Sequence, residues 1–449
     1  MQSFEINKSD LLKIKNALEA NDTELQRVLG EYHASEIAIL FERLNPEERE
    51  KIINVLPSDI ASEVISEMDE ENHPEQILFN LHPEKRSEII EELDYDDATD
   101  IISQLEEHEQ EQVLEHIDQE DATNIRALLH YDEDTAGGLM NTDVIKLNAN
   151  LNKKDALEEV IRQSEEKEEF YTIYAVNDRD ILQGIVSLKD IIKSKPDVMV
   201  HDLLKTDYVY VKAEVDQEEV ARLMSQYNLT SIPVVNDHLK LLGRITIDDI
   251  IDVMEEENTE DILKISGVSE DEELSGNWQD AVKSRLPWLI INLGTAFLAA
   301  SVIRHFGALE AKLPIIAAYM TIIAGMGGNA ATQALAVTVR RISLSDLTDA
   351  QAYNTVLKEF LVGMINGAVN GIIVLVVALF YDANPMLGLV LFLAMTGNLI
   401  VAGLTGASIP LLLKRLGIDP AVASSIIITT FTDCIGFLLP LWLASALLL

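Results

Sequence analysis

The sequence contains a single cysteine, Cys434, and has few basic side chains for its length. One cysteine excludes an internal disulfide framework and a thiolate-rich metal cluster. Only 34 Lys and Arg residues oppose 76 Asp and Glu residues among 449, so the net charge is -42. A surface this acidic repels nucleic acid, whose binding proteins need a basic footprint, and it attracts cations. We therefore expect cations as ligands and no nucleic-acid partner.

The second part of the chain lacks this charge and has long apolar runs instead. From Pro287 onward there are seven acidic and seven basic residues, so the first 286 residues carry all of the net charge. Five apolar stretches, near 287–303, 313–339, 360–381, 386–413 and 422–449, are each long enough to cross a bilayer core of about 30 Å. Residues 1–40 contain no apolar signal-peptide core. The stretches predict a multi-pass membrane domain.

Loop charges predict the orientation of these spans. With the N-terminus inside, the inner flanks hold seven basic residues and the outer loops only Arg304 and Lys312. Because Lys and Arg accumulate on the cytoplasmic side, this favours a cytoplasmic N-terminus and an external C-terminus. We expect the protein in the cell (inner) membrane.

A repeat of about twelve residues runs from 44 to 129. Apolar anchors are followed by short polar segments such as Asn45-Pro46-Glu47 and His82-Pro83-Glu84. Proline in the first turn with carboxylates at the positive end of the dipole indicates helix starts. Short helices that cannot bury their apolar faces alone are expected to stack into an array. The array could be a plain helical spacer or a domain that senses or docks a ligand.

A second repeat, between about 138 and 254, is offset by 59 residues. Val176-Asn177-Asp178 recurs at 235–237, and Gly184 to Ser187 recurs as Gly243 to Thr246. Each copy predicts a helix, an apolar strand, a strand with glycine and a helix capped by Ser187 or Thr246. Five extra residues in the first copy are expected in the charged run 165–169.

This second repeat resembles a tandem pair of cystathionine-β-synthase (CBS) domains. In that family a Gly-x-x-Ser/Thr-x-x-Asp element can hold the ribose and phosphate of an adenine nucleotide. The resemblance makes Ser187, Asp190, Thr246 and Asp249 candidate nucleotide-binding residues. The alternative is that Ser187 and Thr246 are only N-caps, with the two aspartates in the first turn.

The segment 248–264 predicts an acidic helix of about 17 residues that leads toward the first span. Its apolar positions follow a helical period, and its polar face is dense in carboxylates. Crowded like charges destabilise a helix by about 0.3 kcal/mol per pair. A divalent ion with retained waters, such as Mg2+, would relieve this repulsion. A solvated acidic face is the alternative.

Asp433 lies well inside the last apolar stretch, whereas Asp419 and Glu359 are placed close to span ends. An ionisable group costs at least about 2.5 kcal/mol at the bilayer centre, so it normally faces an ion, water or a partner charge. The second span contains Gly327-Gly328-Asn329 and Gln333, in which small residues permit close helix approach and amide oxygens offer ligands. A two-fold axis would place two Asp433 side chains around one pore.

Taken in order, these parts resemble an MgtE-type magnesium channel or transporter. The motifs are Tyr131 to Met140 at the exit of the helical domain, Gly327-Gly328-Asn329 with Gln333, Asp419-Pro420-Ala421, and Thr432-Asp433 with Gly436. The implied fold is a multidomain membrane protein with an α-helical superhelical N domain, tandem α/β CBS domains, a connecting helix and five transmembrane helices. The expected limits are 1–136 for the N domain, 137–254 for the CBS pair, 255–283 for the acidic connecting (plug) helix and linker, and 284–449 for the membrane domain.

The resemblance also implies site residues. The pore carboxylate falls on Asp433, with Asn329, Gln333 and Asp419 at the pore lining or entrance. Carboxylates that would sense cytosolic Mg2+ fall on Glu63, Asp96, Asp100, Asp216, Glu218, Asp249, Asp252, Glu257, Glu260 and Asp261. The chain departs from the family pattern at two positions, where Asn228 replaces a frequent Asp ligand and Ile426 replaces a common Pro before the pore Asp.

The function implied is passive Mg2+ uptake by a homodimer in membrane lipid, shut by cytosolic Mg2+, with ATP or another adenine nucleotide as a further candidate ligand. No enzymatic activity is expected. A Gly-x-x-x-x-Gly-Lys-Ser/Thr loop of an ATP-driven pump is absent from the sequence. Because carboxylate and amide oxygens suit all hard dications, transport of Mn2+, Co2+ or Ca2+ stays an alternative, as does a nucleotide-regulated CBS channel of different selectivity.

Overall fold

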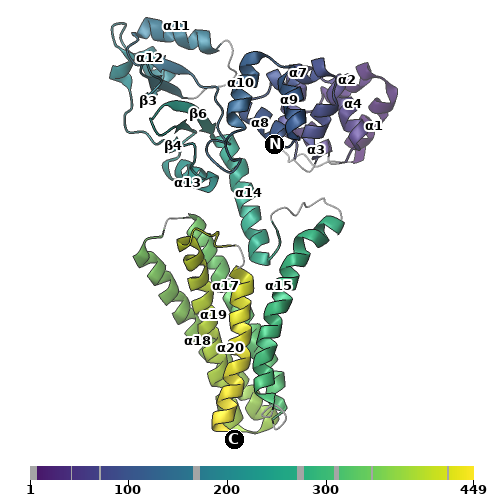
Figure 1. Cartoon of the computed structure of the whole chain (residues 1–449), viewed down its shortest axis with the longest axis vertical. Helices are drawn as coiled ribbons and strands as arrows, with labels where there is room; N and C mark the ends of the chain where they lie inside the picture. The colour runs from purple at the N-terminus through teal and green to yellow at the C-terminus, as the bar shows by residue number, and fades with distance from the viewer. Residues whose placement is uncertain are drawn as a thin grey trace. The chain divides into compact units, whose positions relative to one another are not determined.

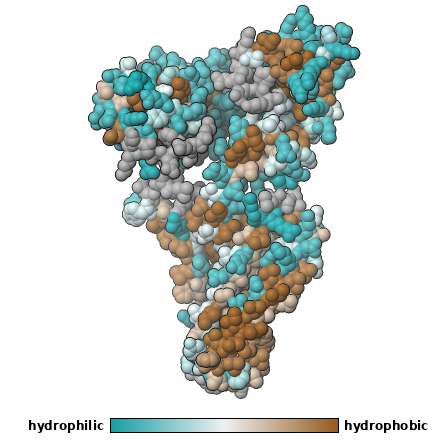
Figure 2. Space-filling model, turned by 180° about the vertical axis from the view of Figure 1, so that it is seen from behind, coloured by the Kyte–Doolittle hydropathy of each residue, from teal (hydrophilic) through white to brown (hydrophobic). Residues whose placement is uncertain are grey.

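A computed structural model describes residues 8–41, 43–69, 72–164, 172–269, 278–307, 313–344, 347–421 and 424–448 (Figure 1). The chain forms two compact units, which divide between Met254 and Glu255. The first contains the helical domain and both CBS repeats, and the second contains the membrane helices. Hydrophobic side chains gather over the helices of the second unit, whereas hydrophilic ones dominate the first (Figure 2).

The N-terminal domain consists of short helices that stack in two rows. Beyond the pair α1 and α2, the strongest packing joins helices two places apart, as for α3 on α5, α5 on α7 and α8 on α10. Asn45 and Glu48 form a reciprocal capping box at the start of α4, and Pro46 occupies its first turn. The helices are α1 Lys8–Ala20, α2 Asp22–Leu29, α3 Ala34–Phe41, α4 Pro46–Val55, α5 Ser58–Ser66, α6 Pro74–Asn80, α7 Pro83–Glu91, α8 Tyr95–Ser103, α9 Glu107–Leu114 and α10 Gln119–Leu128.

The CBS pair contains two three-stranded sheets of the same topology. In each sheet a short parallel strand joins an antiparallel pair, in the orders β1-β2-β3 and β4-β5-β6. The elements are β1 Lys146–Asn148, α11 Lys153–Ser164, β2 Ile173–Val176, β3 Leu182–Val186, α12 Leu188–Lys193, a 3-10 turn Val200–Leu203, β4 Val211–Lys212, α13 Gln217–Tyr227, β5 Ser231–Val235, β6 Leu241–Thr246 and α14 Ile247–Ser266.

The two copies meet through equivalent residues. Ser231 Oγ donates to Thr172 Oγ1 at 3.0 Å, and these two positions are 59 residues apart, the offset of the repeat. The Tyr174 hydroxyl, which is fully buried, lies 3.2 Å from the same Ser231 Oγ. The predicted tandem repeat is confirmed, but the extra segment 165–169 lies outside the described residues.

Five helices in the second unit are long and apolar enough to cross a membrane, as the sequence predicts. They are α15 Trp278–His305, α17 Ile315–Leu344, α18 Asp349–Asp382, α19 Pro385–Arg415 and α20 Ser424–Leu447. The apolar stretch predicted from 360 is part of a helix that begins at Asp349. Glu359, expected close to the end of the apolar stretch, lies in the third turn of α18, where it is 6% exposed.

The tightest packing in the membrane unit joins α18 to α19. A Cβ atom added at Gly363 would stand 2.5 Å from the carbonyl oxygen of Leu399. A Cβ at Gly403 would stand 2.4 Å from the carbonyl oxygen of Glu359. Only glycine permits this approach of the two backbones, which is a usual device for helix association in membranes.

Candidate functional site

Carboxylates gather where α8 of the helical domain meets the start of α14. Asp96, only 9% exposed, comes from the first turn of α8, and Asp249 comes from the first turn of α14. Burial raises the pKa of Asp96 well above its ordinary value, and the charges of Asp97 and Asp249 add to this. Burial also raises the pKa of Asp97 to about 7, helped by the charges of Asp94 and Asp249. We call these four residues the junction cluster.

The junction cluster is a place where negative charge is costly. Its members repel one another, and burial of Asp96, Asp97 and Asp249 removes the water that would screen their charges. A bound cation would lower this cost by attracting the charged forms of the carboxyls. Protonation is the other way to lower the cost, so cations and protons should compete here.

Asp249 is held in place by its own sequence motif. Its Oδ2 accepts hydrogen bonds from the backbone N–H of Thr246 at 2.9 Å and from the Thr246 hydroxyl at 2.6 Å. Ser187 occupies the equivalent N-cap position before α12, but its side chain makes no capping hydrogen bond. The capping role predicted for the Ser187 side chain is therefore wrong. The second repeat therefore has a hydrogen bond between the hydroxyl and the aspartate of its motif, which the described part of the first repeat does not show.

Other predicted sensing residues lie elsewhere in the first unit. Asp216 caps α13, because its Oδ1 accepts from the backbone N–H of Glu218 at 2.9 Å. Glu63 lies on α5. The residue of this region whose charge raises the pKa of Asp97 is not Glu63 but Glu67, the C-cap of α5. Asp100 raises the pKa of Asp96, so this predicted residue does lie beside the junction cluster.

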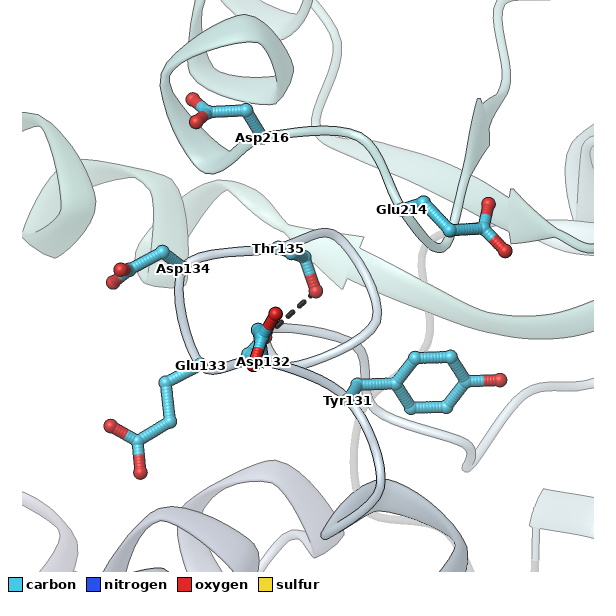
Figure 3. A pocket seen from close by; sticks show the side chains of 7 residues that line it. All are labelled: Tyr131, Asp132, Glu133, Asp134, Thr135, Glu214 and Asp216. Atoms are coloured by element: carbon cyan, nitrogen blue, oxygen red, sulfur yellow. Dashed lines mark hydrogen bonds between the residues drawn. The ribbon is translucent and has the colours of Figure 1, made fainter. Parts of the chain in front are cut away.

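Asp216 also lines an open cavity of about 480 Å3 between α13 and the linker after α10 (Figure 3). A hydrogen bond of 2.7 Å from the Thr135 hydroxyl to the carbonyl oxygen of Asp132 closes the linker turn. The acidic side chains diverge around the turn rather than meet at one point (Figure 3). Throughout the described parts of the chain, no three His, Cys, Asp or Glu side chains are arranged to hold a metal ion. The lining residues are Tyr131, Asp132, Glu133, Asp134, Thr135, Glu214 and Asp216.

The second half of α14 contacts the membrane helices directly. Ser343 of α17 donates to Asp261 at 3.1 Å, and Arg340 of α17 donates to Asn258 at 2.9 Å. Burial raises the pKa of Asp261, although the Ser343 hydrogen bond opposes this. Lys264 pairs with Glu260, as well as with Asp419 at 3.0 Å. Of the predicted residues on the helix, Glu260 and Asp261 thus take part in these contacts with the membrane helices.

Asp252 and Glu257 occupy intermediate turns of the same helix. Asp252 is exposed and Glu257 is half-buried. Between the two lies the division of the chain into its compact units.

The predicted pore residues lie on two helices of the membrane unit. Asp433 is half-buried on α20, next to the fully buried Thr432. Within the described membrane helices, no basic side chain pairs with Asp433. Asn329 and Gln333 are exposed on α17 and one helical turn apart. Gly325 is a turn before Asn329, and among the described residues no atom lies within 4 Å of a Cβ added there, so α17 is open at this turn.

Sequence reasoning missed several of these residues. Asp97 could have been found from the acidic run Asp94-Tyr95-Asp96-Asp97, whereas Lys264 carries no local signal. Asn398 of α19 is fully buried, and its Nδ2 donates to the carbonyl oxygen of Ile323 at 2.8 Å. A Cβ at Gly327 would collide with that amide, which explains why the predicted Gly-Gly-Asn motif begins with glycine.

Known families and relatives cover nearly the whole chain. Family models match for the MgtE intracellular N domain at residues 32–134, the CBS domain at 136–197 and 200–256, and MgtE, described as a divalent cation transporter, at 320–443. The magnesium transporter MgtE of Thermus thermophilus is 32% identical over 97% of this chain and 98% of its own length. That of Enterococcus faecalis is 37% identical over 72% of this chain and 71% of its own.

Two solved structures resemble the first unit. A crystal structure of the cytosolic domain of the Mg2+ channel MgtE in complex with ATP has 32% identity and a TM-score of 0.51, covering 54% of this chain and 99% of that one. A crystal structure of the soluble part of a magnesium transporter has 26% identity and a TM-score of 0.50, covering 56% of this chain and 98% of that one. Since the similarity spans the helical domain, the CBS pair and the membrane helices in one order, the chain belongs to the MgtE family of magnesium transporters.

Proposed function

We propose that this protein is a homodimeric channel for passive Mg2+ uptake, which cytosolic Mg2+ shuts by binding to carboxylates of the N domain, the CBS pair and α14. The observation that carries the transport half is Asp433, a carboxylate inside an apolar helix. Such a group normally faces an ion or a water-filled path, and no basic side chain of the described membrane helices pairs with it. Magnesium transporters that are 32–37% identical support Mg2+ as the substrate.

The bare face of α17 supports the homodimer. Gly325, Asn329 and Gln333 place small and amide side chains on one side of an apolar helix, where both amide residues are exposed and no described atom lies within 4 Å of a Cβ added at Gly325. In a two-fold dimer this face and Asp433 of each protomer would border one central path. Amide oxygens at its wall would contact the waters that Mg2+ retains.

Closure follows from the charge of the soluble half. Two copies of a chain with net charge -42 repel one another strongly at low cytosolic Mg2+. Mg2+ would neutralise the junction cluster and the carboxylates of α14, and so favour the compact arrangement. Because several ions would prefer that arrangement, their differential affinities add and the closing response becomes steep.

Flux measurements test the transport half. Purified protein in liposomes should conduct Mg2+, and Asp433→Asn should abolish the flux while keeping the size of the side chain. Asp349→Asn is the matched control, since Asp349 is a carboxylate on α18 with a side chain 92% exposed. If Mg2+ does not pass but Mn2+, Co2+ or Ca2+ does, the substrate assignment is wrong. If no cation passes, the transport proposal is refuted.

The same liposomes test the gating half. Raising Mg2+ on the face bearing the soluble domains from micromolar to about 10 mM should shut the flux. If flux is insensitive to Mg2+ on that face, the gating half is refuted while the transport half stands. Flux inhibited only from the opposite face would also refute the gating half, because the carboxylates of the soluble domains would then not be the inhibiting site.

Nucleotide binding is a second candidate function, at the first CBS motif only. Asp249 of the second motif accepts a hydrogen bond from Thr246 and belongs to the junction cluster. Asp190 of the first motif is half-buried, and the nearby Ser187 side chain makes no capping hydrogen bond. A relative's cytosolic domain has been solved in complex with ATP. Calorimetry with ATP should detect binding that Asp190→Ala removes and Asp249→Ala retains. Loss of binding only in Asp249→Ala would assign the nucleotide to the second motif instead.

A further inference from the structure

Lys264 lies in the last turn of α14, at the point where this helix contacts the membrane helices. The helix ends at Gly267, whose φ of +75° reverses the chain, and the backbone N–H of Val268 donates to the carbonyl oxygen of Leu263 at 3.0 Å. This cap fixes the rotation of the last turn. A cation there is also favoured by the negative end of the helix dipole.

The ammonium of Lys264 lies between two carboxylates from separate parts of the chain. Glu260, one turn earlier on α14, pairs with it, and Asp419 Oδ2, in the turn between α19 and α20, accepts from it at 3.0 Å. The Lys264 side chain is only 15% exposed, against 29% for Glu260 and 36% for Asp419. The contact is therefore shielded more than an ordinary surface ion pair.

Both ends of this bridge are held by other contacts. The second oxygen of Asp419 accepts from the backbone N–H of Ala421 at 2.8 Å, which orients its carboxylate. Ile265, next to Lys264, packs on a buried cluster that includes Leu335 of α17 and Ala421. The bridge thus joins two pre-positioned groups, and little side-chain freedom is lost when it forms.

An ammonium between two carboxylates does the same electrostatic work as a bound dication, but it is part of the chain. It reduces the combined charge of Glu260 and Asp419 from -2 to -1 at any Mg2+ concentration. Without it, the two carboxylates would repel one another and push the end of α14 from the α19–α20 turn.

We infer that Lys264 is a positioning residue that holds α14 to the α19–α20 turn as an internal cation and thereby lowers the cytosolic Mg2+ concentration needed to close the pore. The inference rests on the proposed gating by Mg2+. It adds a fixed cation to the closing mechanism, so part of the closing free energy is independent of Mg2+.

Inhibition curves of full-length protein in liposomes test the role of Lys264. Lys264→Met keeps most of the aliphatic stem and removes the charge, and it should raise the Mg2+ concentration of half-inhibition about tenfold, which is about 1.4 kcal/mol. Lys264→Arg keeps the charge and should stay within about twofold of wild type. Lys154→Met is the matched control, because Lys154 is 81% exposed on α11 and pairs only with its neighbour Glu158 among the described ion pairs. The flux of each variant with chelator on the face bearing the soluble domains measures the amount of functional protein, and each inhibition curve is divided by that flux.

A double-mutant cycle tests whether Lys264 acts through Asp419. Asp419→Asn and Lys264→Met should together shift the half-inhibition concentration by clearly less than the product of the single shifts. An unchanged or lower half-inhibition concentration in Lys264→Met, an arginine variant as defective as the methionine one, or independent shifts in the cycle would each overturn the inference. Wild-type flux that ignores Mg2+ would instead refute the proposed gating itself.

Discussion

Replacing Asp97 with asparagine is expected to strengthen the packing of α8 in Mg2+-free buffer. Burial, and then the charges of Asp94 and Asp249, raise the pKa of Asp97 from 3.8 to about 7. A carboxyl with a raised pKa binds its proton more tightly in the packed state than in the opened one. Its favourable contribution is therefore complete below about pH 4, falls as the pH rises to about 7, and is lost above it.

The magnitude follows from the two pKa values. A change from 3.8 to about 7 corresponds to about 4.4 kcal/mol of destabilisation above pH 7, at about 1.36 kcal/mol per pKa unit. Asp97 keeps part of its surface in water, so relaxation and screening reduce this, and we take about half. The asparagine variant should then gain about 2 kcal/mol at pH 8, which is about a 30-fold change in the opening equilibrium.

Hydrogen exchange of the backbone amides of α8 measures this opening in the full-length protein. At pH 8 with chelator, exchange in Asp97→Asn should be about 30-fold slower than in wild type, and the difference should shrink to a few-fold at pH 5. Mg2+ should slow exchange in wild type more than in the variant. Glu107→Gln, which removes an exposed carboxylate on the neighbouring α9, should leave α8 unchanged.

Faster exchange in Asp97→Asn at pH 8 would refute this reasoning. It would mean that the ionised carboxylate stabilises α8 and that repulsion within the junction cluster is weak. An equal rate at every pH would also refute it, because the raised pKa requires a pH-dependent difference.

Two further outcomes are expected. Gly403→Ala should destabilise the membrane domain by about 2 kcal/mol, because its Cβ would stand 2.4 Å from a backbone carbonyl of α18. A lowered melting temperature in detergent would reveal this, while Gly294→Ala, which adds a methyl with no atom within 4 Å, should have little effect. Neutralising Asp249, Asp252 and Glu257 together should leave Mg2+ flux high at about 10 mM cytosolic Mg2+, and normal closure in that triple variant would contradict the proposed sensor.

Local patterns in the sequence were sufficient to predict the elements of the fold. The twelve-residue spacing placed an apolar anchor just after the ends of helices, and Leu44, Leu56 and Leu81, which follow α3, α4 and α6, are all at least 96% buried. Proline with carboxylates correctly marked the starts of α4 and α7. Strands β1 and β4 were not foreseen, because strands of three and two residues are too short to show a period.

The candidate site was less predictable, because it depends on which segments meet. Asp97 and Asp249 are far apart in the sequence, and each alone is an ordinary aspartate in the first turn of a helix. Only the folded first unit brings their charges together and removes water from them. The start of α18 at Asp349 was not predicted for a related reason, since hydropathy marks where apolar residues begin and not where the helix begins.

The charges of α14 differ along its length in a way that suits a sensor. In its first turn, burial and the charges of Asp248 and Asp94 raise the pKa of Asp249, so under the proposed gating the state of that end depends on ions from solution. Its last turn carries Lys264, which neutralises the neighbouring carboxylates from within the chain. If both ends depended on Mg2+, closure would require more ions and a higher concentration. If both were bridged internally, Mg2+ would have no free energy to contribute. A helix bridged at one end and dependent on ions at the other can stay close to its closed position and still respond to Mg2+.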